Sequence, residues 1–451
     1  MLKISKKINF ASVAYLVIGL WFVAMFPGRL GFDYSEMIRI IQRGESTDWW
    51  TGLFFWYVKI LSFNGQFIFL CSFFGLLALT HAVRMFTKTL PTSELIQDKV
   101  FFYISLVPLF PVFGLTVSHD VFQTSGIILL LSREVAIFRG IRVPGLSSPI
   151  FVVLASIQLL TTRTGVFLLV LYIIIKILQR RRVEAVAIAL CCLILPTVSG
   201  LGVERVDSKM ALARVLVSDL KCVAQHPEAE ISQVEWGFLD SIAPREQWLA
   251  ASSCTSADAQ LSTMTLSDKA VANTDFLRQY FSIIAKNPAI VVVAHLQKSR
   301  GALPPPFFQG PDNQVELDTS LPIGLNTNIA LQSGPEILHP SIDEPSVEIN
   351  LSILKPLEAV AQAPVLLVNQ ASWFWGWGGL WLWPLLAYLI FNLKIRQWRY
   401  FFSITAPLLL HHATMVAIGP GAFGRYYMSA ILMGVMASIY LFIQKLHSND
   451  E

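Results

Sequence analysis

The chain has 451 residues, of which 54% are hydrophobic and 14% are charged, and its mean hydropathy is +0.57. Soluble domains contain about 25% charged residues, so this composition excludes a soluble globular protein and predicts a polytopic membrane protein. The formal net charge of +4 gives no argument for a nucleic-acid partner, and none is expected.

The N-terminal segment combines Lys3, Lys6 and Lys7 with an apolar run that ends in Met25-Phe26-Pro27. A signal peptide would end in a small-residue cleavage site, and none follows this run. We therefore expect a retained signal anchor that forms the first membrane span.

A polar stretch, residues 26–36, follows this span directly and places Asp33 and Glu36 at the membrane surface. Apolar residues then alternate with charges over Tyr34 to Arg43, which predicts a short amphipathic helix along that surface. The aromatic segment from Trp49 to Leu61 is too short to span and is expected to lie at the interface.

Apolar runs of spanning character recur along the rest of the chain, since a span needs about 20 apolar residues. The sequence predicts ten spans, at about 9–26, 66–86, 100–117, 121–138, 149–161, 164–179, 184–202, 372–392, 400–418 and 426–444. The run at 149–161 is the shortest and could instead be a re-entrant half-helix. The fold class is therefore an all-α polytopic membrane protein.

The distribution of Lys and Arg orients these spans, because positive charges collect in short cytoplasmic loops. With both termini inside, seventeen Lys and Arg fall in inside loops and six in short outside segments. Omitting the span at 149–161 would move Lys176 to Arg182 outside, so the charge rule supports ten spans. The protein is expected in the plasma or inner membrane.

Three parts follow from this topology. Residues 1–202 form an N-terminal membrane domain of about seven spans, whose first outer loop is 27–65. Residues 203–370 form an extracytoplasmic region with eleven Lys and Arg against nineteen Asp and Glu. Residues 371–451 supply about three more spans.

The extracytoplasmic region shows helical periodicity over 208–225, over 273–287 and from Pro288 to Arg300. Residues 301–350 read as a long loop without regular structure. Cys222 and Cys254 are the two cysteines of this region and could pair in an oxidising compartment. His295 is expected to be an ordinary surface or packing residue.

Ionisable residues near the outer membrane surface are the candidates for chemistry, because charges at membrane depth are costly and usually functional. All of them fall on one side of the membrane, as a single cavity would require. They are Asp33, Glu36, Asp48, His119, Asp120, Arg163 and Arg425, with His411 and His412 somewhat deeper.

The two carboxylates of this set have a catalytic and a structural interpretation. Asp33 can act as a general base that deprotonates an acceptor hydroxyl, or it can cap the helix that follows it. Asp120 can be the cap of the fourth span. Alternatively, His119 and Asp120 together hold a cation or orient a phosphate, so a divalent cation stays possible although no metal-site spacing is present.

The basic residues suit a phosphate. Arg425 stands in a glycine-rich segment where the last span begins and can bind a phosphate or pyrophosphate, or anchor the interface together with Tyr426. Arg163 is the same kind of candidate. Of His411 and His412, at most one is expected to line the cavity, because adjacent helical positions face different directions.

The order of these motifs resembles the GT-C class of integral-membrane glycosyltransferases. The resemblance rests on Pro27-Gly28 and Asp33 after one span, on Ser118-His119-Asp120 at the outer end of the fourth span, on Asn287-Pro288 before Arg300, and on Arg425-Tyr426. It is closest to bacterial polytopic members. Where those chains often have a His-Pro pair, this chain has Trp49-Trp50-Thr51-Gly52.

The resemblance implies a polyprenyl-phosphate-linked sugar donor, used on the extracytoplasmic face with inversion at the anomeric carbon. Asp33 would be the general base, Asp120 a second acid of the cavity, and Arg425 a contact to the donor phosphate. The acceptor would be a glycan, lipid or protein of the cell envelope, and membrane lipids would surround the spans.

Two other functions remain open. A polysaccharide polymerase or ligase would depend on His295, Arg278, Arg300 and His411 rather than on Asp33. A transporter or flippase would need polar residues through the middle of the spans, and these are mostly apolar here. A purely structural membrane protein is the last alternative.

Overall fold

The computed structural model of the chain is almost entirely helical where it describes the chain. It describes residues 9–26, 28–30, 32–46, 51–144, 146, 148–203, 208–250, 254, 261, 264–267, 275–298, 321–322, 363–364, 367–368, 378–392, 394–395, 398–418 and 427–448. Most of the loop expected at 301–350 lies outside these ranges.

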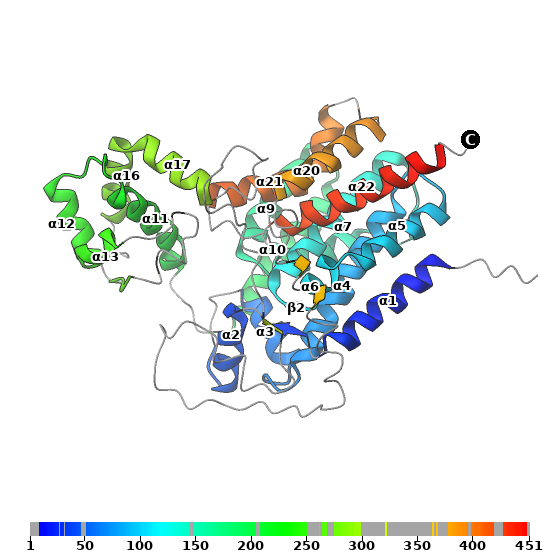
Figure 1. The fold of residues 1–451 in the computed structure, drawn as a ribbon, viewed down its shortest axis with the longest axis horizontal. Helices are drawn as coiled ribbons and strands as arrows, with labels where there is room; N and C mark the ends of the chain where they lie inside the picture. Colours follow the sequence, from blue (N-terminus) through cyan, green and yellow to red (C-terminus); the bar gives the residue numbers. More distant parts are fainter. Residues whose placement is uncertain are drawn as a thin grey trace, which may run out of the picture.

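The apolar runs all coincide with described helices, and these pack side by side as one bundle (Figure 1). The run at 100–117 is divided, because Pro108 separates two helices there. The bundle consists of α1 (Phe10–Ala24), α4 (Ile68–Lys88), α5 (Glu94–Leu106), α6 (Leu109–Gly114), α7 (His119–Arg139), α8 (Pro149–Leu159), α9 (Arg163–Leu178), α10 (Arg182–Ser199), α20 (Gly378–Ala387), the π-helix η3 (Tyr388–Asn392), α21 (Trp398–Ile418) and α22 (Met428–Ser448).

Within the described ranges, four helices are both long and apolar enough to cross a membrane: Ile68–Lys88, His119–Arg139, Arg182–Ser199 and the Met428–Leu446 part of α22. Several shorter apolar helices accompany them, among them α1, α8 and the α20–η3 segment. The chain is therefore an all-α protein with the apolar helices of a membrane protein. The number of ten spans and their orientation stay predictions.

Helix α8 is the short run that the sequence left ambiguous. At about 1.5 Å per residue its 11 residues cover about 17 Å, roughly half of a ~30 Å hydrocarbon layer. It packs against the first half of α7, where a Cβ on Gly126 would lie 2.9 Å from the carbonyl oxygen of Ala155. The preceding segment carries the buried side chains of Val143 and Leu146. Whether this run spans or is a re-entrant half-helix stays a prediction.

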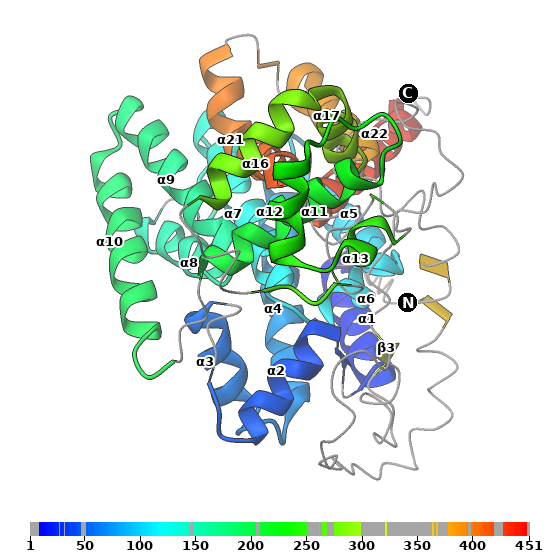
Figure 2. The same cartoon turned by 90° about the vertical axis from the view of Figure 1, so that its left-hand side faces the viewer.

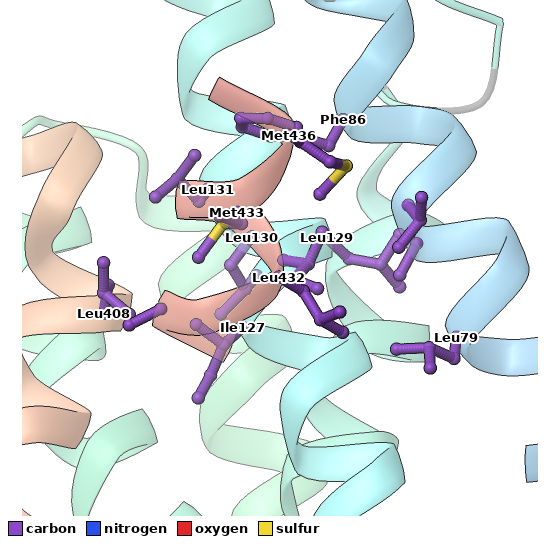
Figure 3. Packing of buried hydrophobic residues seen from close by; sticks show 14 of the residues in the cluster. Leu79, Phe86, Ile127, Leu129, Leu130, Leu131, Leu408, Leu432, Met433 and Met436 are labelled. Atoms are coloured by element: carbon purple, nitrogen blue, oxygen red, sulfur yellow. The ribbon is translucent and has the colours of Figure 1, made fainter. Parts of the chain in front are cut away.

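The core of the bundle lies where α4, α7 and α22 meet (Figure 3). Helix α7 is buried along most of its length, and its leucines at 129–131 interdigitate with Met433 and Met436 of α22. Phe86 of α4 closes the same cluster. Helix α10 is the opposite case, because most of its apolar side chains face outward, as expected for contact with lipid.

Two short helices, α2 (Phe32–Gln42) and α3 (Gly52–Leu61), cover one end of the bundle (Figures 1 and 2). The starts of α7 and α9 lie at the same end, because Ser118 contacts Tyr34 of α2 and Thr161 contacts Thr51 at the start of α3.

The opposite end carries a buried network of charges. Lys176 of α9 is fully buried and contacts Glu134 of α7, while Glu184 of α10 accepts a 2.9 Å hydrogen bond from Arg133. These pairs join three helices, as buried charges require partners.

Five further helices form a separate layer around a core of their own: α11 (Ser208–Gln225), α12 (Gln233–Ile242), α13 (Arg245–Leu249), α16 (Phe276–Lys286) and α17 (Pro288–Lys298). We call them the 208–298 domain. The helices expected at 208–225, 273–287 and after Pro288 are confirmed. Trp248 fills the centre, and a disulfide joins Cys222 to Cys254. The domain stands beside the bundle, with α17 next to α21 (Figure 1).

Candidate functional site at the start of helix α7

The first loop is tied to the start of α7 through its backbone. Residues Arg29–Leu30 form β1, which pairs in parallel with β2 (Thr116–Val117), in the register Arg29 with Thr116 and Leu30 with Val117. Strand β3 (Leu321–Pro322) pairs with β1 from the other side in antiparallel orientation. Because β2 directly precedes Ser118-His119-Asp120, the pairing brings two predicted site segments together although about ninety residues separate them.

The turn that enters β1 requires glycine. Gly28 has φ of 117°, a region that side chains with a Cβ rarely adopt. A Cβ at this position would also collide with the side chain of Ser72 on α4. The glycine of the Pro27-Gly28 motif therefore has a structural role, because it allows the close approach of the loop to α4.

Helix α2 follows, and its apolar face packs on α3. Tyr34, Met37 and Ile41 are buried against the α3 residues Phe54 and Val58. The expected amphipathic helix is thus present, but it begins at Phe32, so Asp33 lies in its first turn rather than at the cap. The side chains of Asp33 and Glu36 lie outside the described part of the chain, as does Asp48.

The hydroxyl of Tyr34 connects α2 to α7. It is 3.0 Å from the Ser118 hydroxyl and in closer contact with Nδ1 of His119. Tyr34 is 1% exposed, so these contacts take place in the interior. Sequence reasoning gave Tyr34 no role, since a tyrosine in an amphipathic helix reads as an interfacial residue.

The first turn of α7 holds the two predicted site residues His119 and Asp120. Ser118 is the cap, because its Oγ accepts the backbone N–H of Asp120 at 3.0 Å, so the interpretation of Asp120 as the cap is wrong. The Asp120 carboxylate accepts a 3.1 Å hydrogen bond from Ser118 and lies 3.7 Å from Nε2 of His119. Asp120 is buried, whereas the His119 side chain is 23% exposed.

Helix α9 begins beside this turn. The Thr161 hydroxyl lies 3.4 Å from the backbone carbonyl of His119, and Gln123 of α7 donates a 2.8 Å hydrogen bond to Thr164. Thr162 caps α9 by accepting the N–H of Gly165. Arg163, at the first position of α9, therefore lies at the same end of the bundle as Tyr34 and His119.

Residues 51–56 contact the start of α9 and the end of α10. Thr51 caps α3 and donates a 2.8 Å hydrogen bond to the carbonyl of Thr161, and Trp56 donates to the carbonyl of Ser199. A Cβ on Gly52 would collide with that same carbonyl. Thr51 and Gly52 thus fix the position of the start of α3.

The remaining predicted residues divide into two groups. Arg425 and Tyr426 lie outside the described residues, immediately before Tyr427 at the start of α22. His411 and His412 are both buried in α21, and the ring of His412 is 5.2 Å from that of Tyr427. The sequence predicted that at most one of the two histidines lines the cavity, and both side chains are buried.

No group of three or more His, Cys, Asp or Glu side chains within the described ranges could hold a metal ion. His119 and Asp120 form a pair without a third ligand of this kind among them. The divalent cation considered for this position stays a prediction.

A second polar cluster, which sequence reasoning missed, lies in the 208–298 domain. Asp219 of α11 accepts hydrogen bonds of 2.5 Å from Lys298 and 3.2 Å from Tyr280, and it lies 3.7 Å from Nδ1 of His295. Contact with this carboxylate raises the pKa of His295, while burial lowers the pKa of Lys298. The spacing of His295 and Lys298, three residues apart on one helical face, was the signal for it.

His295 also reaches the bundle, since its Nε2 is 2.7 Å from the backbone carbonyl of Val416 on α21. It therefore joins the two parts of the protein, and of the surface and packing roles expected for it, the structure shows packing. Asn287 of the Asn-Pro motif has a structural role, because its side chain bonds both the N–H and the carbonyl of Glu230. Arg278 is exposed on α16, and Arg300 lies outside the described residues.

The chain matches no protein-family model, no curated protein and no solved structure with which it was compared. Its function is therefore argued from these residues.

Proposed function

We propose that the chain is a membrane glycosyltransferase that moves a sugar from a polyprenyl-phosphate donor to an acceptor on the extracytoplasmic face. The observation that carries this proposal is the docking of the first loop on the start of α7. Through β1–β2 pairing and the Tyr34 contacts, the helix that bears Asp33 lies against His119 and Asp120. Arg163 begins the neighbouring helix.

In the proposed reaction, the Asp33 carboxylate takes the proton of an acceptor hydroxyl. The oxygen of that hydroxyl attacks the anomeric carbon of the donor sugar as the bond from this carbon to the lipid phosphate breaks. The phosphate leaves with the bonding electrons, and the anomeric centre is inverted. General-base catalysis of this kind typically contributes a factor of about 10² to 10⁴ in rate.

The leaving phosphate needs positive charge. Arg163 is at the N-terminus of α9, where the helix dipole adds to the attraction for an anion. Arg425 and Tyr426 precede Tyr427, which contacts His412 near the end of α21. The proposal assigns the two arginines to the donor phosphate, and Glu36 and His119 to the walls of the same outward-facing site.

A polysaccharide polymerase or ligase is the second candidate, and a specific observation favours it. His295 combines partial exposure with contacts to Asp219 and to the backbone of α21. An enzyme of that class would depend on this histidine more than on Asp33.

The two candidates are separated by measuring sugar transfer from a polyprenyl-phosphate donor with the purified protein in liposomes. The variants are Asp33→Asn and His295→Gln, with Glu45→Gln as the matched control. Glu45 is an exposed carboxylate a few residues beyond α2, paired with Arg43. We expect Asp33→Asn to lose at least about 10²-fold in kcat and Glu45→Gln to retain wild-type activity.

Full activity of folded Asp33→Asn would remove Asp33 as the base. Loss confined to His295→Gln would favour the polymerase or ligase. The sidedness is tested separately with topology reporters fused after residue 120 and within 208–298, and a cytoplasmic signal at either position contradicts the proposed site.

A further inference from the structure

The Tyr34 hydroxyl lies within hydrogen-bond distance of Nδ1 of His119 and of Oγ of Ser118. It is buried together with Ser118 and Asp120, and the rings of Tyr34, Phe54 and His119 pack against one another. The direction of each hydrogen bond in this cluster follows from which groups can donate.

An ionised carboxylate only accepts hydrogen bonds. Ser118 therefore donates to Asp120 Oδ2. Nε2 of His119 faces Asp120 Oδ1 at 3.7 Å, and the negative charge of the carboxylate favours a proton on this nitrogen. This tautomer leaves Nδ1 as an acceptor. Both neighbours of Tyr34 are then acceptors, so the tyrosine hydroxyl is the donor that completes the chain.

We propose that Asp120 and His119 are positioning residues that lock helix α2. Asp120 fixes the tautomer of His119, and His119 Nδ1 accepts the hydroxyl of Tyr34. The lock holds the first turn of α2, and with it Asp33, at the start of α7. The assignment of Asp33 as the held base rests on the proposed function, whereas the lock itself does not.

A directional anchor is needed because the other contacts of α2 leave its rotation poorly defined. The face of α2 toward α3 is apolar, and apolar burial is non-directional. The strands β1 and β2 have only two residues each and end before the helix. Neighbouring residues on a helix leave it about 100° apart, so a fixed Tyr34 sets the direction in which the side chain of residue 33 leaves the helix.

The lock is tested first by hydrogen–deuterium exchange of peptides that cover residues 32–42. Tyr34→Phe removes only the hydroxyl, and we expect exchange about tenfold faster there. Tyr57→Phe is the matched control: Tyr57 belongs to the same apolar cluster, but its hydroxyl donates to the carbonyl of Cys71. It should leave exchange in α2 unchanged.

Two substitutions of His119 separate the lock from simple packing. His119→Asn places an amide oxygen near the position of Nδ1 and can still accept from Tyr34, whereas His119→Gln reaches only the Nε2 position. We expect Asn to retain most of the protection of α2 and Gln to lose it. Equal exchange in the two variants, or unchanged exchange in Tyr34→Phe, overturns the lock.

Activity then tests the positioning role. In the sugar-transfer assay, Tyr34→Phe should lower kcat about tenfold while KM changes less than about twofold. Asp120→Asn should resemble it, and a loss in Asp120→Asn far beyond that of Tyr34→Phe would show that Asp120 contacts the substrate and would overturn its positioning role. A wild-type protein that transfers no sugar but shows the expected exchange pattern refutes the proposed function and leaves the lock standing.

Discussion

His295 donates a hydrogen bond of 2.7 Å to the backbone carbonyl of Val416 and so joins α17 of the 208–298 domain to α21 of the bundle. Its other ring nitrogen faces Asp219 at 3.7 Å. A carbonyl only accepts, so Nε2 carries a proton, and the charge of the nearby carboxylate favours a second proton on Nδ1. The contact therefore favours the imidazolium form of His295.

The first prediction concerns the pH dependence of this contact. The pKa of His295 is raised by Asp219, which outweighs the opposing effects of burial and of Lys298. Because the pKa is raised in the folded state, the contact contributes its full stabilisation below the unfolded-state pKa of about 6.5. This stabilisation is lost as pH rises through the folded-state pKa. We expect exchange in the C-terminal half of α17 to accelerate as pH rises through this window, after correction for intrinsic exchange rates. His295→Gln should show no such step, and a step of equal size in that variant would exclude His295 as its source.

The second prediction concerns the ion pair between Asp219 and Lys298, which are 3% and 0% exposed in their side chains. Lys298→Met leaves a buried carboxylate without its main counter-charge and should cost about 3–5 kcal/mol in the stability of the domain. The double variant Asp219→Leu with Lys298→Met should recover much of this loss. Thermal unfolding monitored by tryptophan fluorescence measures it, because Trp248 lies in the core of this domain.

The control for this pair is the exposed ion pair of the same domain. Arg245 and Asp240 are 47% and 38% exposed, so Arg245→Met should cost at most about 1 kcal/mol. If Lys298→Met and Arg245→Met lost the same amount of stability, burial would not govern the strength of the Asp219–Lys298 pair.

The third prediction concerns Gly28. Gly28→Ala imposes a left-handed φ on a residue with a Cβ and drives that Cβ into Ser72, so we expect a loss of about 2–4 kcal/mol. Adding Ser72→Gly should relieve the collision but not the backbone strain, and should restore part of the stability. The control is Gly19→Ala in α1, where a Cβ meets nothing within 4 Å. The midpoint of thermal unfolding in detergent compares the three.

The fourth prediction concerns the disulfide between Cys222 and Cys254, which closes a loop of 32 residues. In the chain-entropy model, such a loop corresponds to about 3–4 kcal/mol of stabilisation. Replacing both cysteines by alanine should lower the unfolding midpoint of the 208–298 domain, and reduction of the wild type should shift its mobility on a gel. Cys191 and Cys192 in α10 offer a control pair, since their replacement should leave that gel shift in place.

The helices of the bundle could be predicted from the sequence because they coincide with apolar runs, whereas α12 and α13 of the 208–298 domain were not predicted. The short apolar run at 149–161 also forms a helix, but hydropathy alone could not predict that this helix has only 11 residues. The break at Pro108 was missed, because proline interrupts a helix without interrupting the apolar composition.

The candidate site was predictable only as a set of residues. Charge counting predicts that Asp33, Asp120 and Arg163 lie on one side of the membrane, but it could not supply the register of β1 with β2 or the contact of Tyr34 with His119. Pairing between two-residue strands leaves almost no pattern in a sequence. Asp219 was missed for a related reason, since its partners lie about sixty and eighty residues away.

The pairing of β1 on both sides also determines when the first loop can be completed during synthesis. Leu30 needs Val117 as one neighbour and Leu321 as the other, so the N-terminal loop remains unfinished until about three quarters of the chain has emerged. Contacts between such distant residues form late, because a long loop must close first. The segment made first is therefore among the last to reach its final place, and a chain truncated before residue 321 would carry all of the N-terminal helices but an incomplete first loop.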